Sequence, residues 1–256
     1  MTDTDKKLAR IPVVPRPAAT ILLLRDDPLE VLMIRRHQKQ FFGSALVFPG
    51  GVVQESDYSD DWLPLVEDSE GLDPEERALR IAGFRETFEE TGILLAKGPD
   101  GRCMPCVGET EAFIEVVHAS GGRLVLSDLV RFGHWITPER SPQRFDTHFF
   151  LCLTAEGQEA VCDGGEAVAL EWARPDDISA RAAGGEASIL FPTRMNISRL
   201  AESTSAQAAL ARWRGQDIFT VSPWVEKREG GLAVVIPKEA GYRETENFVP
   251  SAKLAD

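Results

Sequence analysis

Basic residues are scarce in this chain relative to acidic ones. Its 256 residues include 28 Lys and Arg against 41 Asp and Glu, which gives a formal net charge of −13. A surface dominated by negative charge repels a phosphate backbone, which argues against a nucleic-acid interface. An anionic ligand would therefore need a bound cation or a few well-placed Arg and Lys side chains.

Long apolar runs are also missing. No stretch approaches the roughly 20 apolar residues that span a bilayer, and the first ten residues are polar, without the apolar centre of a secretory signal. The last six residues, Ser251 to Asp256, do not end in the Ser-Lys-Leu peroxisomal signal. We expect no membrane segment, a disordered N-terminus over residues 1–16 and a cytoplasmic location.

Cysteine is rare, with four residues in the chain. Cys103 and Cys106 have the spacing of a zinc knuckle or a redox pair. A structural zinc needs two further ligands, and Cys152 and Cys162 do not form a second close pair. Structural zinc, a redox pair and ordinary reduced thiols of a cytosolic protein all stay open.

The rest of the composition is that of a globular protein, with 43% apolar and 27% charged residues. The length is sufficient for one elaborated domain with a sizeable core. Apolar periodicity and turn residues predict a chain that mixes strands and helices. Strands are expected at residues 18–24, 31–34, 46–48, 93–96, 132–136, 145–153, 167–172 and 232–236, and helices at 74–91, 109–119, 176–183 and 195–214.

The helix expected at 74–91 carries three carboxylates, Glu86, Glu89 and Glu90. Spacings of three and four residues place side chains on one helix face, where like charges cost about 0.2–0.5 kcal/mol per pair. A hard divalent cation with oxygen ligands would account for this concentration of charge. The alternative is the solvated acidic face of an ordinary amphipathic helix.

The ends of this helix are well marked. Asp73 can cap the first turn, Pro74 suits its first position, and Gly92 can terminate the helix in the left-handed conformation. Gly83 in the middle costs about 1 kcal/mol relative to alanine. We therefore expect it to allow a bulky ligand or a neighbouring loop to come close on the carboxylate face.

The residues around this helix resemble the Nudix box. Arg85-Glu86-x-x-Glu89-Glu90-x-Gly92 followed by an aliphatic residue is similar to its second half, and Phe48-Pro49-Gly50-Gly51 is similar to its opening. The resemblance implies the α/β (α+β) Nudix fold, a mixed sheet between helices with a loop-helix-loop that binds metal and diphosphate. We place this domain at residues 17–184, with a helical C-terminal elaboration and tail at 185–256 packed on it.

The two halves of the box are separated by an insertion. Gly51 and Arg85 lie 34 positions apart, much farther than in the usual box. The box's first glutamate therefore has three candidates, Glu55, Asp57 and Glu76. Segment 54–71 is acidic and contains Trp62-Leu63-Pro64-Leu65. We expect it to loop out and to rest this apolar patch on the protein or on a second subunit of a homodimer.

An insertion in the box resembles the Nudix subgroup related to peroxisomal coenzyme A diphosphatases. Three further stretches are similar to that subgroup, namely residues 78–95, Trp135-Ile136-Thr137-Pro138 and Arg144-Phe145-Asp146-Thr147-x-Phe149-Phe150. The resemblance implies cleavage of coenzyme A or acyl-coenzyme A to 3′-phospho-AMP and (acyl-)phosphopantetheine. Cleavage of ADP-ribose or a dinucleotide, and a nucleotide-binding module without turnover, stay as alternatives.

The same resemblance implies roles for the box residues. Mg²⁺ or Mn²⁺ would be held by Glu86, Glu89 and Glu90, and would bind phosphate oxygens and activate water. Either Glu86 or Glu90 would act as the base. Arg85 would orient a carboxylate through a bidentate pair or contact phosphate. Gly50 and Gly51 would let the backbone approach metal or phosphate closely.

Candidates outside the box are less sharply defined. A further metal ligand is expected at Glu166, with Glu171 as the alternative. A basic cluster could bind substrate phosphates or form a solvated strand end, and it consists of Arg35, Arg36 and Lys39. Arg144 and Asp146 could line the site or form a buried structural pair. The four histidines show no metal-ligand spacing, and we expect them to be structural: His37, His118, His134 and His148.

Overall fold

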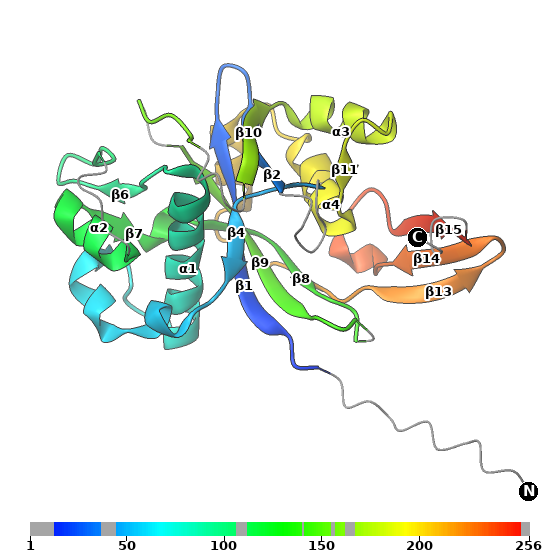
Figure 1. Ribbon diagram of the computed structural model, residues 1–256, viewed down its shortest axis with the longest axis horizontal. Coiled ribbons are helices and arrows are strands. Elements are labelled where there is room, and N and C mark those ends of the chain that lie inside the picture. Colours follow the sequence, from blue (N-terminus) through cyan, green and yellow to red (C-terminus); the bar gives the residue numbers. More distant parts are fainter. Residues whose placement is uncertain are drawn as a thin grey trace, which may run out of the picture.

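One long mixed β-sheet forms the centre of the protein (Figure 1). The structure is a computed structural model that describes residues 13–36, 45–105, 112–139, 141–154, 157–161 and 167–251. The strand order is β11-β3-β2-β1-β9-β8-β12, with β10 on β2 and β4 on β1. These strands are β1 (Arg16–Arg25), β2 (Glu30–Arg36), β3 (Ala45–Val47), β4 (Gly50–Val52), β8 (Val130–Ile136), β9 (Phe145–Leu153), β10 (Ala167–Ala173), β11 (Ser188–Ile189) and β12 (Thr220–Val221).

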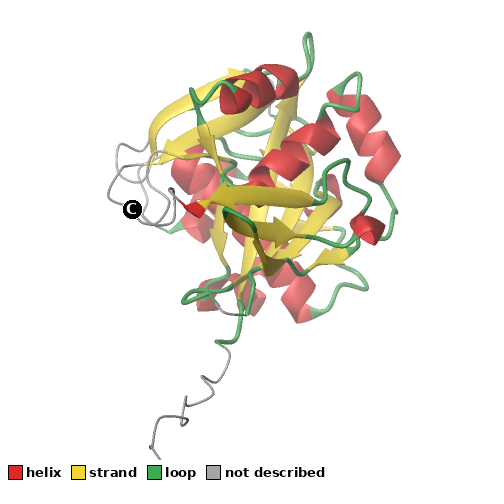
Figure 2. Ribbon diagram, turned by 90° about the vertical axis from the view of Figure 1, so that its right-hand side faces the viewer, coloured by secondary structure: helices red, strands yellow, loops and turns green. Residues whose placement is uncertain are grey.

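Strand β1 lies at the middle of the sheet and is buried on both faces. Its side chains alternate between two clusters, with Ile21 and Leu23 in one and Leu22 and Leu24 in the other. This alternation follows from the two-residue period of a strand. β1 pairs in parallel with β9 and antiparallel with β2 and β4. Helices lie on both faces of the sheet (Figure 2), which keeps the side chains of β1 from solvent on either side.

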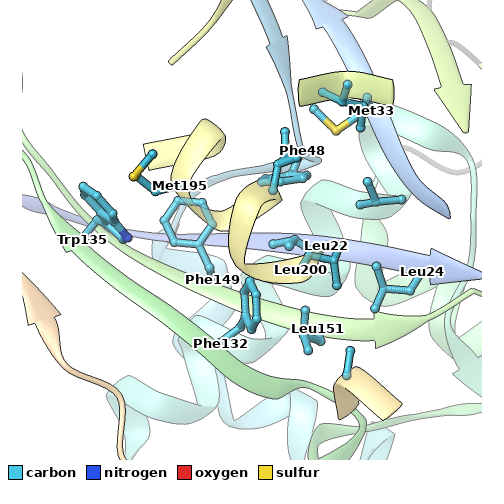
Figure 3. Close-up of a cluster of buried hydrophobic side chains, with 14 of the residues drawn as sticks. Leu22, Leu24, Met33, Phe48, Phe132, Trp135, Phe149, Leu151, Met195 and Leu200 are labelled. Atoms are coloured by element: carbon cyan, nitrogen blue, oxygen red, sulfur yellow. The ribbon is translucent and has the colours of Figure 1, made fainter. Parts of the chain in front are cut away.

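One face is covered by α1 (Pro74–Thr91) and α2 (Phe113–Ser120), together with a small sheet. That sheet has the order β5 (Val66–Glu67), β7 (Arg123–Val125) and β6 (Ala96–Lys97). The opposite face is covered by α3 (Pro175–Ala183), α4 (Phe191–Leu200) and α5 (Ala206–Trp213). Figure 3 shows the core on this second side, where Phe149 and Leu151 of β9 meet Leu200 of α4.

Helix α1 forms over the predicted residues. Asp73 accepts a hydrogen bond from Glu76 N at 2.7 Å, and Gly92 ends the helix with φ +70°. Gly83 faces β1, where an added Cβ would lie 3.3 Å from Ile21. The prediction of a ligand or loop at Gly83 on the carboxylate face was therefore wrong, because the segment that comes close is the central strand of the core.

The C-terminal region corrects two predictions. The single helix expected at 195–214 is interrupted at 201–205, because Ser205 caps a new helix by accepting from Ala208 N. The elaboration is not only helical, since β12 joins the main sheet and three strands form an antiparallel sheet of their own. These are β13 (Trp224–Arg228), β14 (Gly231–Val235) and β15 (Glu246–Pro250), of which only β14 was expected.

Another correction concerns the strand expected at 93–96. Ile93 to Leu95 are buried in the core, and strand pairing begins only at Ala96. Most of the N-terminal segment expected to be disordered, residues 1–12, lies outside the described residues. Among the helices that the structure describes, none is long and apolar enough to cross a membrane.

The insertion at 54–71 folds onto the protein itself. It contains two 3₁₀ turns, η1 (Glu55–Tyr58) and η2 (Asp60–Leu65), and strand β5. Trp62 is 2% exposed, packs against Phe113 with ring centroids 5.6 Å apart, and donates a hydrogen bond to Ser56 O. Leu65 is partly buried, and Leu63 is exposed. The apolar segment thus rests mainly on this chain, which removes the reason for expecting a dimer there.

Candidate active site

Arg85 organises the acidic end of α1. Its Nε and Nη2 donate to the two carboxylate oxygens of Asp57, each at 2.9 Å, in a bidentate pair. Both side chains are buried, with Asp57 fully inaccessible. Asp57 is also fixed by accepting from Gln54 N at 2.8 Å within the turn η1. Among the three candidates for the box's first glutamate, Asp57 therefore takes the position beside the arginine.

The two other candidates lie elsewhere. Glu55 is exposed on η1. Glu76, on the first turn of α1, binds Arg80 at 2.7 Å and also contacts Arg131. Ten residues separate Glu76 from Glu86, which is about 15 Å along the helix axis at 1.5 Å per residue.

The remaining donors of Arg85 hold two of the helix carboxylates. Nη1 donates to Glu86 at 2.7 Å and to Glu89 at 2.9 Å, and Nη2 also donates to Val52 O at 3.0 Å. Burial disfavours the charged guanidinium, but hydrogen bonds to Asp57 and the charges of Glu86 and Asp57 raise the pKa of Arg85 above its ordinary value. Arg85 stays charged and offsets the mutual repulsion of the carboxylates.

Glu90 connects the helix to the glycine pair. Its carboxylate is buried and accepts a hydrogen bond from Gly50 N at 2.9 Å. Gly50 has φ +155°, and a Cβ there would lie 2.4 Å from Ala19 O. A side chain at this position would both strain the backbone and collide with β1. Glycine is thus required for β4 to run close to the central strand under Glu90.

Gly51 provides the corresponding space for Glu86. A Cβ on Gly51 would lie 2.4 Å from the carboxylate carbon of Glu86. Glu86 therefore lies directly over the glycine backbone, with 14% of its side chain exposed. Glu89 is more open, with 45% exposed. The three carboxylates run from the buried Glu90 to the solvent-facing Glu89.

This arrangement fits a hard divalent cation. The side chains that could bind a metal here all offer carboxylate oxygens, which hard cations prefer. In the part of the chain that is described, the ligand atoms of Glu86, Glu89 and Glu90 do not all meet within 4.8 Å of one another. Glu90 is held at Gly50 N, while Glu86 and Glu89 are held by Arg85. A cation would draw these carboxylates together by competing with those bonds.

The structure does not bring all of the phosphate-binding and metal-binding candidates outside the box to this site. Arg35, near the end of β2, is half-buried and pairs with Leu46 of β3, which leads into the glycine pair. Lys39, Glu166 and the side chain of Arg36 lie outside the described residues. Glu171 accepts from Arg181 of α3 at 2.9 Å, on the opposite face of the sheet from α1.

Arg144 and Asp146 do not form the structural pair considered from the sequence. Arg144 is buried and donates to Thr137 O and Val13 O, which ties the segment before β1 to the β8–β9 connection. Asp146 contacts His134 and His148 instead. The sequence did not indicate this cluster, because it depends on the register of two strands.

Two of the four cysteines lie in the described part of the chain. Cys103 and Cys152 are free thiols, and burial raises the pKa of each. Thiols with raised pKa values stay protonated, which makes them poor nucleophiles. Cys106 and Cys162 lie outside the described residues, so the zinc and redox alternatives for Cys103 and Cys106 stay open beside ordinary reduced thiols.

Comparison with known proteins identifies the family. A family model described as the NUDT19 Nudix domain matches residues 67–200, just over half of the chain. The chain belongs to this family. The matched range contains all of α1, whereas Gly50 and Gly51 precede it.

Several relatives cover most of the chain. "Putative nudix hydrolase 7" of Caenorhabditis elegans is 28% identical over 198 residues, which are 73% of this chain and 61% of that protein. "Acyl-coenzyme A diphosphatase NUDT19" of Homo sapiens is 25% identical over 294 residues, covering 91% of this chain and 78% of that protein. This chain thus spans less than two thirds of the nematode relative.

A solved structure supports the same assignment. The crystal structure of a Nudix hydrolase from Alicyclobacillus acidocaldarius has a TM-score of 0.68 at 28% identity, covering 80% of this chain and 99% of that one. The predicted Nudix membership and the α/β Nudix fold are confirmed.

Proposed function

We propose that this chain is a metal-dependent diphosphatase that cleaves coenzyme A or acyl-coenzyme A to 3′-phospho-AMP and (acyl-)phosphopantetheine. The observation that carries the proposal is the set of three carboxylates beside the glycine pair. Arg85, which Asp57 fixes, binds Glu86 and Glu89, and Gly50 N binds Glu90. The relatives named acyl-coenzyme A diphosphatase support the choice of substrate.

Glu86, Glu89 and Glu90 would hold Mg²⁺ or Mn²⁺, and Glu166 is our proposal for a further ligand. The bound ion would neutralise diphosphate oxygens and lower the pKa of a water molecule. Arg85 sets the positions of Glu86 and Glu89, and Gly50 N sets that of Glu90. Either Glu86 or Glu90 would act as the base and accept a proton from the attacking water.

Binding of the substrate's phosphates needs positive charge in this acidic protein. Arg35 lies on β2 beside β3, and β3 leads directly into the glycine pair. We propose that Arg35, with Arg36 and Lys39, contacts a phosphate of the adenosine part of the substrate. Arg144 is a weaker candidate, because two of its donors already bind backbone carbonyls.

The test is a panel of coenzyme A, an acyl-coenzyme A, dephospho-coenzyme A, ADP-ribose and a dinucleotide polyphosphate at millimolar Mg²⁺ or Mn²⁺, with products identified by mass. We expect the two coenzyme A substrates to be cleaved, and dephospho-coenzyme A to react more slowly when the 3′-phosphate is bound. Arg35→Met should raise KM for coenzyme A more than for dephospho-coenzyme A.

Two results would contradict the proposal. Cleavage of ADP-ribose without action on coenzyme A would assign the site to the alternative substrate class. Binding of nucleotides without turnover of any member of the panel would indicate a binding module. Glu89→Gln serves as the control for turnover by a contaminating enzyme.

A further inference from the structure

Two histidines and an aspartate gather on β8 and β9, away from the carboxylates of the candidate active site. Asp146 and His148 are two residues apart on β9, so that their side chains share one face of the sheet. His134 on β8 is directly opposite His148. The same row continues into Phe150 and Cys152, which belong to the core under α1.

The three side chains are in contact. Nε2 of His134 lies 2.5 Å from Oδ1 of Asp146, and Nε2 of His148 lies 3.6 Å from the same oxygen. The two imidazole rings stack with centroids 3.9 Å apart. One ligand atom from each residue lies within 4.8 Å of the others, and among the described residues no other group of three His, Cys, Asp or Glu meets this condition.

We propose that His134, Asp146 and His148 form a binding site for a borderline divalent transition metal such as Zn²⁺. Two imidazoles and one carboxylate are ligands that suit Zn²⁺ better than Mg²⁺, which prefers oxygen. Each of the three side chains is partly exposed, between 16% and 35%, so a cation can reach them and keep water in an open position.

Thr220 supports His134 in this role. Its Oγ1 lies 2.8 Å from Nδ1 of His134, and the parallel pairing of β12 with β8 sets Thr220 beside His134. A neutral imidazole that binds a metal through Nε2 carries its proton on Nδ1. The hydroxyl oxygen of Thr220 can accept that proton in a hydrogen bond, which fixes the tautomer and the ring orientation.

Arg131 opposes binding at His148 and would have to move. Its Nη1 lies 3.1 Å from Nδ1 of His148, and its Nη2 contacts the carboxylate of Glu76. Guanidinium can only donate, so Nδ1 is the acceptor in this arrangement. Ligation through Nε2 places the proton on Nδ1 and therefore breaks this bond. It also turns one ring out of the stack, because a metal lies in the plane of each imidazole that binds it.

The trio and the carboxylates of α1 lie on either side of β1, where Ala19 pairs with Gly51 on one side and with His148 on the other. The trio connects through Arg131 to Glu76 on the first turn of α1, whereas Glu86 to Glu90 lie on its last turns. The ligand chemistry also differs, since the α1 set contains only oxygens. The protein should therefore bind Zn²⁺ at the trio when the α1 set is disabled.

The experiment uses the metal-stripped full chain and measures Zn²⁺ binding by calorimetry and Co²⁺ binding by visible absorption. In calorimetry, wild type and Glu89→Gln should both bind Zn²⁺ with high affinity. With Co²⁺, both should show the visible absorption band of a site that contains nitrogen ligands. His148→Ala and the near-isosteric Asp146→Asn should lose both signals while unfolding at a normal temperature without metal. Thr220→Val should weaken Zn²⁺ binding by about tenfold to a hundredfold, as other lost partners of metal-binding histidines do.

Arg131→Met provides a test in the opposite direction. It removes a cation and the competing donor, so Zn²⁺ should bind at least as tightly as in wild type. Retention of the Zn²⁺ event in both His148→Ala and Asp146→Asn would overturn the proposal, because the metal would then bind elsewhere, for example to thiols. Loss of that event in Glu89→Gln would overturn it as well.

Discussion

Replacing Asp57 by asparagine should weaken both the fold and the candidate active site. The new side chain keeps the shape of the old one but loses its charge. In either orientation its NH₂ group would face a nitrogen of Arg85, and in one of them it would also face Gln54 N, and all of these nitrogens are donors. Removing one partner of a buried ion pair costs about 3–5 kcal/mol. Arg85 keeps Glu86 and Glu89 as partners, so we expect a value of about 3 kcal/mol, at the lower end of that range.

The assay is urea and thermal unfolding of wild type and Asp57→Asn, with turnover measured in parallel. At about 2–4 °C per kcal/mol for a chain of this size, Tm should fall by about 6–12 °C. The matched control is Asp60→Asn, in the same insertion, whose ion-pair partner is Arg77 and whose side chain is 82% exposed. An exposed pair contributes about 0–1 kcal/mol, so this control should unfold almost as wild type does.

Turnover should fall even at temperatures where Asp57→Asn is folded, because Arg85 would no longer be fixed and would not hold Glu86 and Glu89 in place. An Asp57→Asn protein with the Tm and the kcat of Asp60→Asn would refute the reasoning. It would show that Glu86 and Glu89 are sufficient to hold Arg85.

Three further substitutions test the candidate active site and the packing of the insertion. Glu89→Gln, whose side chain is 45% exposed, should fold normally and lower kcat about a hundredfold or more at saturating Mg²⁺, as measured by single-substrate kinetics. Gly51→Ala would place a Cβ 2.4 Å from the carboxylate of Glu86 and should lower kcat strongly, whereas Gly184→Ala, where the nearest atom is 3.4 Å away, should not. Trp62→Ala should cost about 3–5 kcal/mol in the free energy of unfolding measured in urea, because a buried aromatic side chain is removed from its contact with Phe113.

Helix α1 could be predicted from the sequence because its determinants are local. The cap at Asp73, the proline beside it and the terminal Gly92 all act within a few residues of the helix ends. The carboxylate spacing is likewise local. The fold family could be inferred from two short motifs for the same reason, since each half of the box is a continuous run of a few residues.

The partner of Arg85 could not be chosen from the sequence in the same way. Asp57 and Arg85 are 28 residues apart, and the pair forms because η1 turns the Asp57 side chain toward the helix. Glu55 and Glu76 were equally good candidates by residue type. The trio of His134, Asp146 and His148 was missed for a related reason, because it requires the β8–β9 register.

The C-terminal strands were missed because short strands gain stability mainly from their pairing. β13 and β15 have five residues each, and their hydrogen bonds go to β14. Their sequences, Trp-Val-Glu-Lys-Arg and Glu-Asn-Phe-Val-Pro, contain no long alternating pattern. By contrast, β9 has nine residues and a clear apolar run, and it was expected over the residues that it occupies.

The position of the insertion explains how a long extra segment can interrupt the box without disrupting the site. Asp57, near the start of the insertion, is fixed by Gln54 N and Arg85, and α1 begins independently at the Asp73 cap. Between these two points Trp62 packs on α2, and β5 pairs with β7. The geometry at Arg85 therefore depends on residues at the two ends of the insertion. Its middle part contributes instead to stability, through the buried Trp62 and the pairing of β5 with β7.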